Sequence, residues 1–446
     1  MFAEYLLPIL MVVFLFIGIF TGYPVAFILG GLAIIFALIG DVPLPFLGMM
    51  GSRIYGGVLE NWLYIAIPLF VFMGLMLEKS GVASRLLLTL QRLFGRVRGG
   101  LAISVALLGV VMAASTGIVG ASVVMLGLLA LPVMLKQNYK PEMACGVIAA
   151  SGTLGILIPP SIMLVLIGSI MQVSVGNLFK AALIPGLMLG VLYIAYLLIM
   201  GRLKPDWMPL ADTDAVDHDK TPLALALTRD LVGPVFLMVT VLGSIMMGIA
   251  TPTEAAAIGA LGAIFLAVVA RKLTYTTLRD VCYDTAKTTA MIIFIVITAT
   301  AFSLIFKRLG GDYMILDLFD ATGLGSYGLL LAIMVLIFIL GFFLEWIEIS
   351  YVILPILLPV IGLMDFGMST QATLVWFAIL MAINLQTSFL TPPFGYALFY
   401  LKGITNGQVK ITTIYKSIIP YVLLQLTGLL LCIAFPAIVL WLPGLI

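Results

Sequence analysis

Two apolar stretches of the chain carry small and hydroxyl residues directly before a pair of prolines. The first, 152–160, reads Gly-Thr-Leu-Gly-Ile-Leu-Ile-Pro-Pro, and the second, 385–393, reads Leu-Gln-Thr-Ser-Phe-Leu-Thr-Pro-Pro. Proline lacks a backbone N–H and clashes with the preceding helical turn, so each stretch predicts an interrupted helix. The first interruption would free carbonyls near Gly155 and Ile158, which together with nearby hydroxyls suit a cation such as sodium.

Each motif alone also fits a proline kink whose backbone is satisfied by Ser or Thr side chains, as is common in membrane helices. The occurrence of the motif twice favours a binding site over a simple proline kink. Pro159 and Pro392 are 233 residues apart (392 − 159), and two further sequence echoes recur at offsets of 230 and 227. Interrupted helices at matching places in two membrane halves are the best sequence indication of a transporter's binding site. We therefore expect two tandem halves.

Two other apolar segments, 101–135 and 327–364, are each broken midway. The first break reads Ala-Ser-Thr-Gly around Ser115, and the second contains Glu345 and Glu348. Their shortness and polar tips favour re-entrant hairpins over pairs of complete spans. Carboxylates within a span are rare and usually functional, so the two glutamates could bind a cation, relay a proton or contact substrate. They could equally lie at a wet hairpin mouth.

The composition is that of a membrane protein. Hydrophobic residues make up 63% of the chain and charged residues 9%, whereas a soluble domain carries about 25% charged residues. Long apolar runs without alternation exclude a β-barrel, so the predicted class is an all-α polytopic membrane protein. The net charge of +2 without a basic stripe predicts no nucleic-acid partner. The single histidine, His218, lies in a polar loop and predicts no metal site.

A membrane span needs about 20 apolar residues. We expect spans at 5–21, 24–40, 60–78, 143–171, 178–200, 230–250, 253–270, 288–306, 371–400 and 413–442. With the N-terminus outside and both broken segments as hairpins, 18 of the 22 basic residues fall in cytoplasmic loops. Basic residues favour the cytoplasmic side, which supports this topology. The first half then starts outside and the second inside, so the repeats are inverted.

The expected organisation is repeat one at 1–200, a polar cytoplasmic linker at 201–228 and repeat two at 229–446. In each repeat, scaffold spans are followed by an arm along the membrane surface, a hairpin and a broken helix. Repeat one has the arm at 79–99, the hairpin at 101–135 and the broken helix at 143–171. Repeat two has the arm at 307–325, the hairpin at 327–364 and the broken helix at 371–400.

Four motifs carry a resemblance to a known family: Ala-Ser-Thr-Gly at 114–117, Ala-Ser-Gly-Thr-Leu-Gly-Ile-Leu-Ile-Pro-Pro-Ser at 150–161, Gly-Ile-Ala-Thr-Pro-Thr-Glu-Ala at 248–255 and Thr-Pro-Pro-Phe-Gly at 391–395. Over nearly its whole length the chain resembles the large membrane subunit of tripartite ATP-independent periplasmic (TRAP) transporters. The resemblance implies an elevator-type, multi-pass permease of the bacterial inner membrane that imports an organic acid with a sodium gradient. It also implies a small four-helix membrane subunit and a soluble periplasmic solute-binding protein as partners.

Carried over by motif, the resemblance implies two sodium sites and a substrate position between the hairpin tips. The implied sodium ligands are Ser115, Gly155, Ile158 and Pro160 in one site, and Glu345, Trp346, Ile347, Ser388, Thr391 and Phe394 in the other. The implied substrate contacts are Ser115, Thr116, Gly152, Thr153, Glu348, Asn384 and Thr387. The chain departs from the family pattern at Ser388, where relatives often have glycine, and in the two added glutamates. No cofactor other than sodium is expected.

Two other functions compete with this reading. A stand-alone sodium- or proton-coupled dicarboxylate carrier has similar inverted hairpins but needs no binding protein. An intramembrane enzyme would need a nucleophile–base pair or a metal cluster among the spans, and the spans contain no histidine and no paired aspartates. The chain has no Walker motif, so we expect no ATP hydrolysis.

Overall fold

The computed structural model describes residues 5–116, 119–210, 222–405 and 407–445, with the side chains of 113–116 left out. Helices joined by turns make up this part of the chain, and it contains no β-strand. Nine of its helices are long and apolar enough to cross a membrane. The prediction of an all-α polytopic membrane protein is therefore confirmed.

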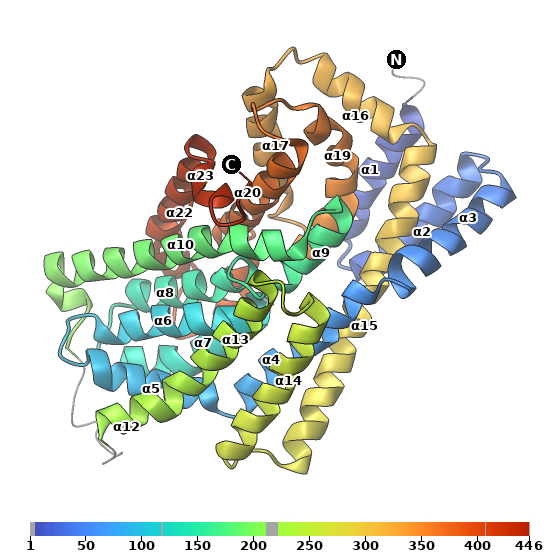
Figure 1. Ribbon diagram of the computed structural model, residues 1–446. Coiled ribbons are helices and arrows are strands. Elements are labelled where there is room, and N and C mark those ends of the chain that lie inside the picture. Colours follow the sequence, from blue (N-terminus) through green and yellow to red (C-terminus); the bar gives the residue numbers. More distant parts are fainter. Residues whose placement is uncertain (1–4, 117–118, 211–221, 406, 446) are drawn as a thin grey trace.

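The N-terminal helices pack with helices from the middle of the chain, and together they form one group (Figure 1). Its members are α1 (Leu6–Phe20), α2 (Val25–Ile39), α3 (Leu44–Ile54), α4 (Ala66–Lys79), α13 (Gly233–Met246), α14 (Pro252–Val269) and α15 (Tyr275–Arg308). Helix α4 packs along α14, and α2 packs along α15. Gly259 permits the first contact, because a Cβ there would lie 2.6 Å from the sulfur of Met73. We call this group the scaffold group.

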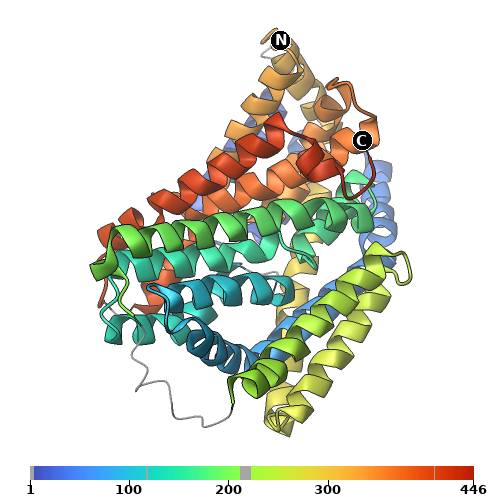
Figure 2. The same ribbon diagram turned by 60° about the vertical axis from the view of Figure 1, so that its left-hand side comes forward.

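A second set of helices, some long and some short, forms another group, which we call the core group. It contains α6 (Gly100–Thr116), α7 (Val119–Lys136), α8 (Pro141–Thr153), α9 (Ile162–Met171), α10 (Val175–Leu203), α17 (Ser326–Leu340), α18 (Trp346–Glu348), α19 (Leu354–Leu363), α20 (Thr370–Leu390), α21 (Tyr396–Ile404), α22 (Ile411–Ala434) and α23 (Ala437–Leu440). Helix α8 packs against α6, α7 and α22, and α10 runs alongside α22 (Figure 2). Every residue of 375–390 in α20 is buried, including the polar side chains of Asn384, Gln386, Thr387 and Ser388.

Two shorter helices occupy the places of the expected surface arms. Helix α5 (Val82–Phe94) buries Leu86 and Leu90 on one face, and its Thr89 donates a 2.8 Å hydrogen bond to the carboxylate of Asp230. Helix α16 (Gly311–Asp320) packs against α19 and α15. The order of arm, helical pair and interrupted helix thus occurs twice along the chain. Their inversion relative to a membrane stays a prediction.

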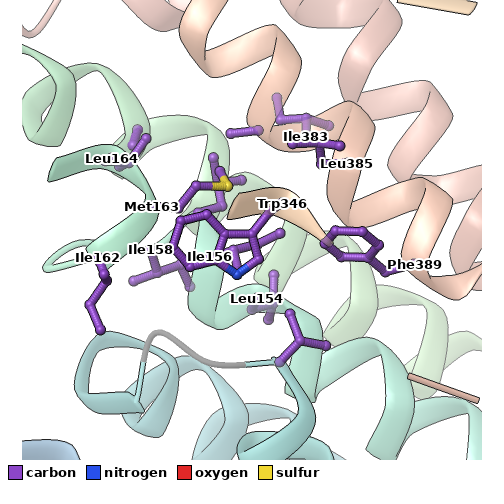
Figure 3. Packing of buried hydrophobic residues seen from close by; sticks show 14 of the residues in the cluster. Leu154, Ile156, Ile158, Ile162, Met163, Leu164, Trp346, Ile383, Leu385 and Phe389 are labelled. Atoms are coloured by element: carbon purple, nitrogen blue, oxygen red, sulfur yellow. The ribbon is translucent and has the colours of Figure 1, made fainter. Parts of the chain in front are cut away.

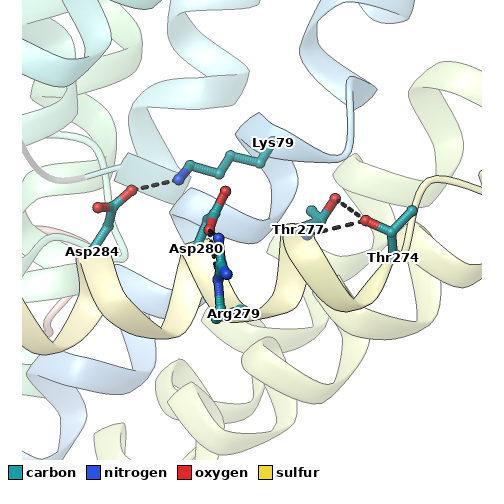
Figure 4. Close-up of polar contacts among 6 residues, drawn as sticks. All are labelled: Lys79, Thr274, Thr277, Arg279, Asp280 and Asp284. Carbon is teal, nitrogen blue, oxygen red and sulfur yellow. Dashed lines mark hydrogen bonds and ion pairs between the residues drawn. The ribbon is translucent and has the colours of Figure 1, made fainter.

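The expected spans leave 271–287 as a loop, but residues 275–287 of this polar segment are helical, so most of that loop prediction is wrong. Helix α15 is a continuous helix of 34 residues, because Thr274 caps its start by accepting a 3.0 Å hydrogen bond from the backbone N–H of Thr277. The charges of its first turns are paired, Arg279 with Asp280 and Asp284 with Lys79 of α4 (Figure 4). A span predicted from hydropathy ends at the first charged residues. The helix itself extends beyond them, because its end is capped and its charges are paired.

Other boundaries also differ from the expected spans. Helix α3 was not expected, because Leu44–Ile54 is too short and too glycine-rich to read as a span. The helix that contains α13 begins earlier, at Leu223, through α12 (Leu223–Leu227) and the π-helical segment Thr228–Val232. The last span ends at Ala434, and α23 follows as a separate turn after Pro436.

Gly146 on α8 lies at a close approach of α8 to α22. A Cβ there would lie 2.4 Å from the backbone oxygen of Ser417, which cannot move without shifting α22. We predict that Gly146→Ala destabilises the protein by about 1–3 kcal/mol through overpacking. The measurement is the thermal unfolding midpoint of the detergent-purified protein.

Gly31→Ala is the matched control, because no atom lies within 4 Å of a Cβ at that helical position. Alanine favours a helix over glycine by about 1 kcal/mol, so this variant should unfold at the same or a higher temperature. Equal midpoints for the two variants would contradict the packing of α8 on α22.

Candidate functional site

The first proline motif interrupts a helix as predicted. Helix α8 ends at Thr153 and a short 3-10 turn follows at Leu154–Ile156. The N–H groups of Leu157 and Ile158 both donate to the carbonyl of Leu154 at 3.0 Å, and the next two residues are prolines. In the described part of the chain, the carbonyls of Gly155 and Ile158 therefore accept no backbone hydrogen bond.

Hydroxyl groups surround this first interruption. Thr153 donates to the carbonyl of Ala150 at 2.9 Å, and Ser161 donates to the carbonyl of Ile156 at 2.6 Å. A hydroxyl that donates to the backbone keeps its lone pairs free for another donor or a cation. The buried hydroxyl of Ser151 has no hydrogen-bond partner within the described chain. The interruption thus gathers oxygen acceptors in a buried place.

The second proline motif has the same construction. Helix α20 ends before Thr391, and α21 begins only after the Pro-Pro pair. The hydroxyls of Thr387, Ser388 and Thr391 donate to the carbonyls of Ile383, Leu385 and Thr387, each at 2.8 Å. The Pro159–Pro160 and Pro392–Pro393 peptide bonds are both cis. The two motifs that match in sequence therefore match in local structure.

The polar break between α17 and α18 packs directly on the second interruption. Asn384 donates a 2.7 Å hydrogen bond through its amide to the carbonyl of Met334, and Tyr396 donates to the carbonyl of Phe343 at 3.2 Å. Gly341 allows the closest approach, because a Cβ there would lie 2.1 Å from the hydroxyl oxygen of Ser388. Ser388, at which the chain departs from the expected family pattern, therefore faces a glycine.

Trp346 joins the two interruptions. Figure 3 shows its ring between Leu154, Ile156 and Ile158 of the first interruption and Ile383 and Phe389 of α20. The side chain is only 5% exposed. Residues far apart in the sequence, from both halves of the chain, therefore meet around one aromatic ring.

The two glutamates lie in different surroundings. Glu345 lines a small cavity of about 40 Å³, whose other lining residues are Val119, Gly120, Trp346, Phe389, Tyr396 and Tyr400. Glu348 does not line this cavity, is 5% exposed, and one of its carboxylate oxygens has no hydrogen-bond partner in the described residues. A wet hairpin mouth therefore does not describe Glu348.

The remaining predicted site residues lie in different surroundings, and their roles stay predictions. Gly152 packs on α7, since a Cβ there would lie 3.0 Å from the backbone of Val123, and Pro160 and Ile347 are buried. The side chain of Phe394 is 43% exposed and packs on Phe343, so its side chain is not directed into the site. Ser115 and Thr116 lie outside the residues whose side chains are described, so their roles stay predictions.

The sequence interpretation missed the aromatic wall of the cavity. Tyr396 and Tyr400 lie four residues apart on α21, a spacing that places both on one helix face. Gly120 meets this wall, because a Cβ there would lie 2.7 Å from the ring of Tyr400. The four-residue spacing of Tyr396 and Tyr400 after the second Pro-Pro pair could have predicted this wall. Nothing in the sequence indicates that Gly120 contacts Tyr400.

Comparisons with known proteins agree on one family. The family model described as "Tripartite ATP-independent periplasmic transporter, DctM component" matches residues 11–438. The chain is 31% identical over 386 residues to the C4-dicarboxylate TRAP transporter large permease protein DctM of Pseudomonas aeruginosa, which covers 86% of this chain and 87% of that protein. It is also 31% identical over 447 residues to the isethionate TRAP transporter permease protein DctMQ of Oleidesulfovibrio alaskensis, covering 99% of this chain and 67% of that protein.

A solved structure shares the fold. The crystal structure of the Alcanivorax borkumensis YdaH transporter matches with a TM-score of 0.61 at 16% identity, over 89% of this chain and 90% of that one. At this identity the match concerns the fold alone. It supports the arrangement of helices on which the site depends.

The contact between Gly341 and Ser388 generates a paired prediction. Gly341→Ala should lower the thermal unfolding midpoint, because its Cβ would collide with the serine side chain. Adding Ser388→Gly should restore stability to that of Ser388→Gly alone, giving a coupling energy of about 1–3 kcal/mol. Thermal unfolding of the four proteins in detergent measures it. Purely additive effects would show that the break between α17 and α18 does not rest on α20 at this point.

Proposed function

Since the chain belongs to the DctM component family of tripartite ATP-independent periplasmic transporters, and is thus a large permease of the bacterial inner membrane, we propose that it imports an organic anion together with sodium ions. The observation that carries the proposal is the pair of interrupted helices, 154–161 and 391–395. Within the described residues, carbonyls at the first accept no backbone hydrogen bond, and at both interruptions hydroxyls donate to carbonyls of their own segment. Unwound carbonyls at membrane depth are the usual sodium ligands of such transporters.

Each proposed sodium ion would take oxygen ligands from one interruption. At the first, these are the carbonyls of Gly155, Ile158 and Pro160 with the hydroxyl of Ser115. At the second, they come from the break at Glu345–Ile347 and from Ser388, Thr391 and Phe394, with Phe394 contributing its backbone. A bound cation would also reduce the cost of burying the Glu348 carboxylate, which has an oxygen without a partner.

The substrate would lie between the two interruptions. Thr153, Asn384 and Thr387 end or line the helices there, and the N-terminal turn of α9 presents free N–H groups that favour an anion. The P. aeruginosa and O. alaskensis relatives are named for C4-dicarboxylate and isethionate, both anions. Two sodium ions with one monovalent anion would carry one positive charge inward, worth about 2.3 kcal/mol per 100 mV.

The proposed partners are a periplasmic solute-binding protein and a small membrane subunit. Binding-protein dependence is a property of the family. The DctMQ relative is longer than this chain, which covers 67% of it, so the small subunit could occupy the remainder there and be a separate protein here.

The proposed movement is an elevator, in which the core group slides against the scaffold group. Few polar contacts join the two groups at the described residues. Asn61 before α4 donates to the hydroxyl of Ser169 on α9 at 2.9 Å, and Tyr351 after α18 donates to the hydroxyl of Tyr64 at 2.8 Å. Small hydroxyl and amide contacts of this kind can break and re-form during sliding, whereas buried ion pairs would not.

Thr391→Ala tests the ion site. The variant should raise the sodium concentration for half-maximal uptake by about tenfold, because a hydrogen-bonding or coordinating group lost next to a charge costs about 1.5 kcal/mol. The assay is uptake into vesicles that contain the complete transporter and its binding protein. Ser115→Ala should act in the same direction.

Thr427→Ala is the matched control, because its hydroxyl makes the same hydrogen bond to the fourth preceding carbonyl, at 2.8 Å on an exposed face of α22. Unchanged sodium activation in both site variants would count against the site assignment. Uptake that persists without the binding protein would instead favour a stand-alone carrier.

A cysteine pair tests the elevator. Asn61→Cys with Ser169→Cys places two thiols where the native side chains are in contact, one in each group. With the exposed Cys282 replaced by serine, cross-linking by mercuric ion should abolish uptake, and excess thiol should restore it. Neither single variant should respond. Full uptake by the cross-linked pair would contradict relative movement at this contact.

A further inference from the structure

A second cavity lies far from the site, at the end of α10. It has a volume of about 450 Å³ and lies between the segment after α5 and the last turn of α10. Its lining residues are Val97, Arg98, Leu198, Gly201, Arg202 and Pro205. This volume falls within the range of about 300–1,000 Å³ that is typical of small-molecule sites.

The cavity is positively charged. Arg98 and Arg202 are both exposed on its wall, and neither forms an ion pair with a carboxylate of the described residues. Gly201 brings them together, because a Cβ there would lie 2.8 Å from the carbonyl oxygen of Arg98. Two guanidinium groups from different segments therefore flank one hollow, and no carboxylate of the described residues neutralises them.

An apolar path leads from this charge along α10. Leu187, Val191 and Leu198 are exposed at spacings of four and seven residues, which places them on one helix face, and Leu198 also lines the cavity. Next to the cavity, Lys140 and Lys204 lie 3.6 and 3.8 Å from the ring centre of Trp207. Tryptophan flanked by lysines is typical of the membrane–water interface.

From this combination we infer that the cavity binds the phosphate group of an anionic phospholipid, with the acyl chains along the exposed face of α10. Guanidinium groups match phosphate oxygens through paired hydrogen bonds. In the expected topology this end of α10 is cytoplasmic, and that leaflet carries anionic lipid. A soluble phosphate would use the arginines but leave the apolar path unused. The inference depends on neither sodium coupling nor the elevator.

The test measures the binding of phosphatidylglycerol and of phosphatidylcholine to the purified protein by native mass spectrometry. We expect phosphatidylglycerol to bind in preference. Arg98→Gln with Arg202→Gln should weaken its binding about 30-fold, from about 1 kcal/mol for each basic residue near a membrane surface. Lysine at both positions should retain most of the binding.

Arg96→Gln with Arg271→Gln is the control, because both residues are exposed, neither lines the cavity, and the same charge is lost. Equal weakening in the two double variants, or none in either, would overturn the inference. A second experiment adds inorganic phosphate as a competitor of phosphatidylglycerol. Displacement of phosphatidylglycerol by an equimolar amount of phosphate would show that the acyl chains contribute nothing and would also overturn it.

Discussion

The need to satisfy buried backbone oxygens governs this molecule. A membrane helix is stable because each carbonyl is bonded within its own segment. The paired prolines at 159–160 and 392–393 remove backbone donors, at a buried point in the first case and at a partly exposed point in the second. At the first, the nearby hydroxyl of Ser161 donates to the carbonyl of Ile156, and the carbonyls of Gly155 and Ile158 accept no backbone hydrogen bond within the described residues. A cation is the simplest group that pairs with several oxygens at once, which is why the fold suits sodium coupling.

Close packing holds these carbonyl groups in place. Glycines stand where helices approach most closely, as Gly341 does opposite Ser388 and Gly152 does opposite the backbone of Val123. Trp346 then fills the space between both interruptions with a rigid ring. Because interiors are packed as densely as crystals, an acceptor in such surroundings cannot turn aside to find another donor. The geometry of the site is therefore set by close contacts within each half and by the ring of Trp346, which lies between them.

Charged side chains are subject to the same need for partners. On the scaffold group, Lys79 of α4 forms an ion pair with Asp284 of α15. Arg98 and Arg202 form no ion pair with a carboxylate of the described residues, and both are exposed, so that water or a lipid headgroup can reach them. Within the described residues, the polar contacts between the two helix groups join neutral side chains, such as Asn61 and Ser169.

The sequence by itself determined the membrane class, the helix interruptions and the family, because hydropathy, proline chemistry and contiguous motifs are local properties. It also indicated Thr391 and Glu345 as site residues. Only the tertiary structure decided that Glu348 is buried away from the cavity, that Tyr400 meets Gly120, and that segment 275–287 is helical. Those outcomes depend on which residues from distant segments fill, cap or neutralise one another, and no local pattern carries that information.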